Sequence, residues 1–160
     1  MLTFLYQLYL NQFDTEQFEP DGFTYLVAKN TQSILQFFDY QVAITPHEAE
    51  PSYRLFIDNI SFVRIVEGCN AISVMILFCA FIIAFSGQLW KTIMFLVAGI
   101  FLIHILNVAR IVILILGLLY IPEYEHVMHD IVFPLFIYGI VFVLWVIWIN
   151  KFSLYAKKTA

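Results

Sequence analysis

The sequence predicts a mainly α-helical membrane protein: a small transmembrane helical bundle with an extracytoplasmic segment that contains one helix and a short β-hairpin. Of its 160 residues, 62% are hydrophobic and 12% are charged, against roughly 45–50% and about 25% in soluble domains. Three long apolar runs favour helices that cross a hydrocarbon core of about 30 Å. A separate stretch concentrates acidic residues and turn formers. A chain of this length has room for a single membrane-embedded domain.

The first part of the chain changes from an apolar stretch to an acidic segment, and within that segment from a helical to a strand pattern. Residues 1–10 are apolar but too short to span, and we expect them to be the outer end of a first transmembrane helix whose beginning is absent. Residues 11–68 form the predicted extracytoplasmic segment, with nine acidic and three basic residues. Within it, residues 23–38 have apolar side chains at helical spacing, which predicts a helix. From Tyr40 the period changes to two on both sides of the breaker-rich PHEAEPS, which predicts a β-hairpin or a short pair of strands.

The rest of the chain is predicted to be mostly transmembrane. We expect spanning helices at residues 70–87, 90–121 and 130–149, and a cytoplasmic tail at residues 150–160. The second helix would be about 48 Å long, more than a hydrocarbon core of about 30 Å requires. It must project, tilt or break, and a break would be most expected within residues 107–110.

Basic residues in short loops and tails mark the cytoplasmic side of a membrane protein. Here they lie in the turn after the first span and in the tail, at Lys91, Lys151, Lys157 and Lys158. With these ends inside, the start of the first span, the outer part of the second and the approach to the last all reach the outer face. The sequence therefore predicts that Cys69, Arg110, His126 and His129 gather at the outer membrane interface.

These residue types together indicate a cysteine active site. A cysteine at a helix N-terminus meets the positive end of the backbone dipole, which favours the nucleophilic thiolate. Histidine supplies a general acid or base, and arginine stabilises the oxyanion of a tetrahedral intermediate. Arg110 interrupts a long apolar run, where a charge costs at least ~2.5 kcal/mol, and such residues are functional candidates. The plainer alternatives are a small buried Cys69 and an interfacial Arg110 that reaches the headgroups.

Four neighbouring polar residues are candidate accessories. Asn107, one turn before the arginine, could hold its guanidinium, and Asn70 could cap the helix after the cysteine. His126 and Asp130 could share a helical face with His129. His104 is interpreted as a satisfied intramembrane histidine and Cys79 as a packing residue.

Other classes of site find little support. Dense ligand spacings such as CxxC or HExxH do not occur, so we expect neither a metal nor another cofactor. The net charge of −4 and the lack of GxxxxGK[ST] argue against nucleic acid and nucleotide partners.

Three stretches, EGCNAISVMILF, NVARIVILI and HDIVFPLFIYGIVFVLW, carry a family resemblance. Together with the hairpin before them they resemble the exosortase/archaeosortase family of membrane-embedded cysteine transpeptidases, especially the short family F branch seen in Bacteroidetes. The similarity extends from about Tyr40 to Phe152 and keeps the order Cys, Arg, His on successive spans. By position, the family's cysteine falls on Cys69, its arginine on Arg110 and its histidine on His129.

The resemblance implies a multi-pass enzyme of the bacterial inner membrane whose active site faces the periplasm. Such an enzyme is a thiol protease or transpeptidase. It cleaves the C-terminal sorting signal of membrane-anchored exported proteins through a thioester, which an unidentified acceptor nucleophile resolves. The commoner family pattern has Ser-Gly after the cysteine, whereas this chain has Asn70-Ala71.

Two other functions are kept as alternatives. The chain could be a non-catalytic membrane subunit or scaffold that binds a partner through its outer segment. In that case Arg110 would pair with an acidic residue: Glu67, Glu125 or Asp130. A small transporter or metal-handling protein would need a polar path across the bilayer, and the spans offer little beyond His104 and Asn107.

Overall fold

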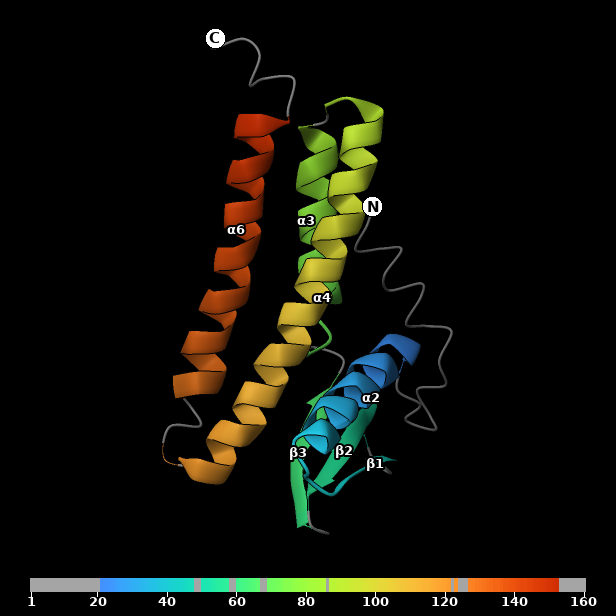
Figure 1. Cartoon of the computed structure of the whole chain (residues 1–160), viewed down its shortest axis with the longest axis vertical. Helices are drawn as coiled ribbons and strands as arrows, with labels where there is room; N and C mark the ends of the chain where they lie inside the picture. Colours follow the sequence, from blue (N-terminus) through green and yellow to red (C-terminus); the bar gives the residue numbers. More distant parts are fainter. Residues whose placement is uncertain are drawn as a thin grey trace.

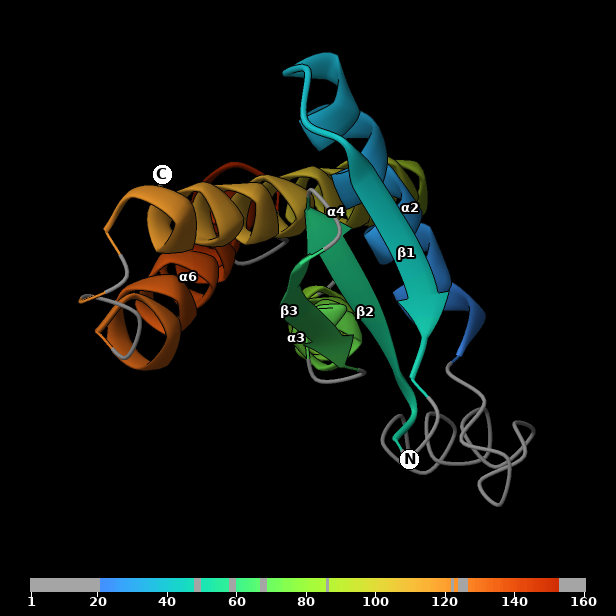
Figure 2. The same cartoon turned by 90° about the horizontal axis from the view of Figure 1, so that it is seen from below.

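The computed structural model describes residues 21–47, 50–57, 60–66, 69–85, 87–121, 123 and 127–152. This part of the chain contains α2 (Gly22–Phe37), β1 (Val42–Pro46), β2 (Ser52–Ile57), β3 (Ile60–Val66), α3 (Ile72–Ala84), α4 (Leu89–Tyr120), the π turn η3 (Met128–Val132) and α6 (Phe133–Lys151). In Figure 1, α2 and the sheet lie at the end toward which α4 runs, and α6 lies away from them in both Figure 1 and Figure 2. The expected first transmembrane segment at residues 1–10 falls outside the described residues.

The predicted helix at residues 23–38 is confirmed as α2, and local signals define both of its ends. At the start, the Asp21 carboxylate accepts the backbone N–H groups of Phe23 and Thr24 at 2.8 and 3.0 Å, as an N-cap does. At the other end, Asp39 adopts the left-handed conformation with φ 66°, and the Tyr40 N–H bonds back into the last turn. Asp tolerates this conformation better than most residues, so it can terminate the helix.

Residues 40–66 contain three strands rather than the expected pair. They form one antiparallel sheet in the order β1-β2-β3. The apolar run at residues 55–66 divides because the chain reverses between Ile57 and Ile60, which are register partners. Asp58 and Asn59 stand between these partners in the sequence, and both residue types favour turns. The alternating pattern alone did not reveal this second reversal.

The predicted helix at residues 90–121 is confirmed as α4, which is one helix of 32 residues, so the alternative of a break within residues 107–110 does not occur. Nothing in residues 107–110 interrupts the backbone ladder, and Val108 and Ile111 are buried against α2 and the sheet. The helix therefore projects beyond the bundle. Its far end is held where the Tyr40 and Tyr120 hydroxyls meet at 3.0 Å, a hydrogen bond that raises the pKa of Tyr40.

Two of the described helices, α4 and α6, are long and apolar enough to cross a membrane. The apolar helix α3 has 13 residues and is about 20 Å long, shorter than the span expected at residues 70–87. It packs between α4 and α6, with the indole N–H of Trp148 donating to the Phe85 carbonyl at 2.8 Å.

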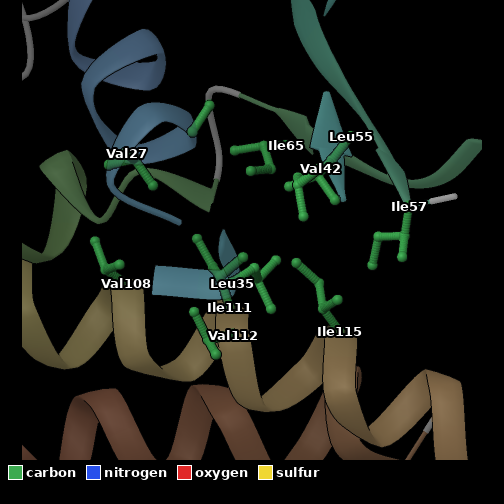
Figure 3. Close-up of a cluster of buried hydrophobic side chains, with 11 residues drawn as sticks. Val27, Leu35, Val42, Leu55, Ile57, Ile65, Val108, Ile111, Val112 and Ile115 are labelled. Atoms are coloured by element: carbon green, nitrogen blue, oxygen red, sulfur yellow. The ribbon is translucent and has the colours of Figure 1, made fainter. Parts of the chain in front are cut away.

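The described residues form two hydrophobic cores that meet along α4. One lies between α2, the sheet and the second half of α4 (Figure 3) and is formed by Val27, Ala28, Leu35, Val42, Leu55, Ile57, Ile65, Val108, Ile111, Val112 and Ile115. The other lies between α3, the first half of α4 and α6 and is formed by Ala71, Met75, Phe78, Ile82, Ile103, Val141 and Trp148. The link from the sheet to α3 connects the two cores.

Candidate active site

A cavity of about 570 Å³ opens between the sheet, α4 and η3. Its walls include Cys69, Arg110 and His129, three residues from different segments of the chain. The rest of the lining is apolar or basic: His47, Arg54, Val63, Arg64, Ile65, Val66, Ile111, Leu114 and Leu118. Among the described lining residues there is no carboxylate, so Arg54, Arg64 and Arg110 make the lining positively charged; the α4 residues beside Arg110 are apolar.

Cys69 lies in the short link between β3 and α3, and α4 fixes its backbone. The side-chain amide of Asn107 donates to the Cys69 carbonyl at 2.8 Å. Asn107 is fully buried, and within the described structure its side-chain oxygen has no hydrogen-bond partner. We expected this amide to contact the guanidinium of Arg110. Its N–H instead binds the Cys69 carbonyl, so it fixes the backbone of the residue that carries the thiol.

Asn70 holds the other side of the same link. Its side-chain oxygen accepts the Ile72 N–H at 3.0 Å and so satisfies a backbone group of the first turn of α3, although the N-cap position that we expected for Asn70 belongs to Ala71. Its side-chain N–H group donates to Thr24 Oγ1 at 3.1 Å and to Asp21 Oδ2 at 3.4 Å. The residue after Cys69 is therefore bound to the start of α2 as well as to α3.

Ala71 occupies the N-cap position of α3 in the left-handed conformation, with φ 61°. An L-residue with a Cβ is disfavoured there by about 1–2 kcal/mol, and glycine is the usual occupant. The link from Cys69 to α3 therefore has an unusual backbone shape that the contacts of Asn70 and Asn107 help to maintain.

Arg110 is half-buried on the face of α4 that lines the cavity. Its guanidinium carbon lies 5.8 Å from the centroid of the Phe133 ring, within the range of a cation–π contact. Its Nε is buried and has no hydrogen-bond partner among the described residues. At about 1.5 Å per residue, Arg110 is roughly 30 Å from the start of α4. This distance equals the thickness of a typical hydrocarbon core, about 30 Å.

His129 is exposed and lies in η3, the wide turn that precedes α6. The Phe133 N–H reaches back to the Met128 carbonyl, five residues earlier. Pro134 follows and has no N–H to donate, which favours such a local widening of the helix. A Cβ added at Gly117 would lie 2.7 Å from the Met128 methyl carbon, so η3 approaches α4 closely at this glycine.

The remaining predicted residues are outside the site or outside the described structure. His126 and the side chain of Asp130 belong to the second group, as do Glu67 and Glu125, so their expected contacts are not described. His104 lies closer than Arg110 to the start of α4, and its Nε2 is 2.9 Å from the Asn30 side-chain nitrogen. Among the described residues, no three His, Cys, Asp or Glu side chains are grouped as metal ligands would be.

Sequence reasoning missed the basic side of the cavity. Arg54 and Arg64 are directly opposite each other on β2 and β3, an arrangement of like charges that usually destabilises a sheet. The Arg54 guanidinium donates to His47 Nε2 at 2.7 Å, and Arg64 pairs with Glu50 at 2.8 Å. A correct register for the second and third strands would have identified this pair.

Comparison with known proteins supports the resemblance to the exosortase family. A family described as transmembrane exosortase matches residues 21–147, which is well over half of the chain and includes Cys69, Arg110 and His129. Neither the curated proteins nor the solved structures gave a match. Placement in the family F branch stays a prediction. The match extends across α2, the sheet, α3, α4 and most of α6, and the chain therefore belongs to the transmembrane exosortase family.

Proposed function

We propose that this exosortase family member is a cysteine protease or transpeptidase that cleaves the C-terminal sorting signal of membrane-anchored exported proteins. The observation that carries the proposal is the shared cavity of Cys69, Arg110 and His129. The three residues supply a thiol, a fixed positive charge and a proton carrier from three separate segments. Family membership adds the reaction class, because exosortases are membrane transpeptidases that act in protein sorting.

The reaction proceeds in two stages. The Cys69 thiolate attacks the carbonyl carbon of the scissile amide, and the oxyanion that forms is stabilised by the Arg110 guanidinium. When this intermediate collapses, the C–N bond breaks, and His129 donates a proton to the leaving amine. The product is a thioester on Cys69. An acceptor nucleophile then loses its proton to His129, attacks the thioester and releases the thiolate.

The apolar α4 wall of the cavity supports this role for Arg110. Ile111, Leu114 and Leu118 line the cavity beside the guanidinium. A positive charge acts more strongly on a developing oxyanion where water is excluded. The contact with Phe133 restricts the guanidinium, so less reorganisation is needed during the reaction.

We place the enzyme in the bacterial inner membrane, with the cavity facing the periplasm. Lys91 and Lys151 lie at the ends of α4 and α6 that are remote from the sheet (Figure 1), and basic residues favour the cytoplasmic side. The cavity is then at the outer interface. A substrate anchored by its own spanning helix would present the peptide bond beside that helix at the same depth.

Co-expression with a protein that has such a sorting signal tests the proposal. Cys69→Ala and Cys69→Ser should abolish processing, whereas Cys79→Ala, in the middle of α3, should leave it intact. Processing that continues unchanged in both Cys69 variants would refute the enzyme and support the non-catalytic subunit. His129→Ala should reduce processing more than His126→Ala does, and the reverse order would transfer the proton carrier to His126.

A further inference from the structure

We propose that α2 is partly embedded in the lipid bilayer, with one edge in contact with phospholipid acyl chains, although it is not a spanning helix. Its buried face packs on α4 and the sheet. Along a different edge Leu26, Ile34 and Phe37 are 45%, 37% and 84% exposed. Lys29 is the charged residue of this helix, and its long stem lets the ammonium group reach the headgroups.

The apolar edge of α2 continues the lipid-facing surface of α4. Val97, Phe101 and Ile105 are exposed at one-turn intervals along α4, being 63%, 65% and 46% accessible. The next residue in this row, Val108, is buried under α2. A cavity of about 240 Å³ lies between the two helices and is lined in part by Ile34, Ile105 and Val108. From this level toward the C-terminal end of α4, α2 covers α4, and its own edge replaces the α4 surface.

The contact between α2 and α4 lies within the thickness of the hydrocarbon core. Trp90 and Lys91, at the start of α4, are residues typical of a membrane interface. At about 1.5 Å per residue, His104 is roughly 18 Å beyond Thr92, in a core of about 30 Å. Asn30 of α2 contacts His104 at 2.9 Å. The middle of α2 is therefore deeper than the outer interface.

Four consecutive polar side chains in the middle of α2, residues 30–33, are hydrogen-bonded within the described structure. The hydroxyls of Thr31 and Ser33 donate to backbone carbonyls one turn earlier at 2.9 and 3.0 Å. The Gln32 amide donates to a β1 carbonyl at 2.8 Å, and Asn30 is paired with His104. Unpaired polar groups are costly in hydrocarbon, whereas a helix in water can leave them to the solvent.

Embedding of α2 would fix the height of the cavity relative to the bilayer. The start of α2 binds Asn70 through Asp21 and Thr24, next to Cys69. The position of α2 in the bilayer would thus determine the position of Cys69, because buried hydrogen bonds connect the start of α2 to the residue after Cys69.

Spin-label accessibility in liposomes tests the placement. In the full chain, with Cys69→Ser and Cys79→Ala, single cysteines are introduced on α2 as Leu26→Cys or Ile34→Cys and labelled with a nitroxide. Thr45→Cys, on the exposed side of β1, is the aqueous reference. Each variant is reconstituted in phosphatidylcholine with phosphatidylglycerol, and collisions with oxygen and with a water-soluble nickel chelate are measured.

Phe101→Cys, on the lipid-facing surface of α4, supplies the membrane reference. If α2 is embedded, labels at Leu26 and Ile34 collide often with oxygen and rarely with the chelate, like the label at Phe101. Chelate access equal to that at Thr45 in these liposomes, which contain no other protein, would overturn the proposal and show a water-exposed edge available to a partner. Each of the two α2 positions is decisive alone, so one poorly folded variant leaves the test intact.

Discussion

Replacing Asn107 by alanine removes the bond that connects α4 to the Cys69 backbone. Asn107 is fully buried and its 2.8 Å hydrogen bond is partly buried, so the loss of this bond and the stranded Cys69 carbonyl should cost about 1–3 kcal/mol of folding free energy. The effect on chemistry should be larger than this cost implies. A reacting atom displaced by about 1 Å can lose roughly 10²-fold in rate, and this amide fixes the residue that carries the thiol.

Two measurements separate positioning from stability. The first is the rate at which a maleimide alkylates Cys69 in the folded protein, with the Cys79 rate as an internal reference. The second is cleavage of a co-expressed sorting signal at matched protein levels. Asn107→Ala should change the Cys69 rate, leave the Cys79 rate alone and reduce cleavage by about 10- to 100-fold.

Asn30→Ala is the matched control. It also removes an amide contact to α4, the one to His104 at 2.9 Å, but it does not touch the link that contains Cys69. Both variants should lose stability, by about 1 kcal/mol or more, and only Asn107→Ala should alter Cys69 reactivity. Equal alkylation rates in the two variants, or equal losses of cleavage, would refute the positioning role of Asn107.

Three further substitutions test the packing. A methyl group at Gly99 would overlap the fully buried Phe78 ring, so Gly99→Ala should lower the free energy of unfolding by about 1–3 kcal/mol. Gly139→Ala meets no atom within 4 Å and should be neutral or stabilising by up to about 1 kcal/mol in the same unfolding assay. At Ala71, with φ 61°, Ala71→Val should cost about 1–3 kcal/mol while Ala71→Gly stays within about 1 kcal/mol; an equal loss would contradict the left-handed backbone.

The sequence was informative wherever one strong physical constraint decided the outcome. Long apolar runs located α4 and α6, and helical spacing located α2 to within a residue. The grouping of Cys69, Arg110 and His129 could be predicted because helix length and bilayer thickness fix depth. Residues at the same end of successive spans must come to one face.

What the sequence could not supply depends on contacts between distant residues. The sequence left open whether the long helix projects, tilts or breaks at residues 107–110; the Asn107 side-chain N–H group binds the Cys69 carbonyl and the helix continues. The ties of Asn70 to Asp21 and Thr24 join segments more than forty residues apart. No periodicity encodes such a pair.

The continuity of α4 has a direct consequence for the proposed chemistry. Among the described elements, α4 contributes core residues to both hydrophobic cores, with Ile103 in one and Val108 in the other. Cys69 packs against the core that contains Val108, and Ala71 belongs to the core that contains Ile103. The link between Cys69 and α3 therefore connects the two cores. A break at residues 107–110 would let the sheet, with its basic cavity wall, move relative to Arg110. An unbroken helix holds both walls in one frame, and the Asn107 hydrogen bond attaches the cysteine to that frame.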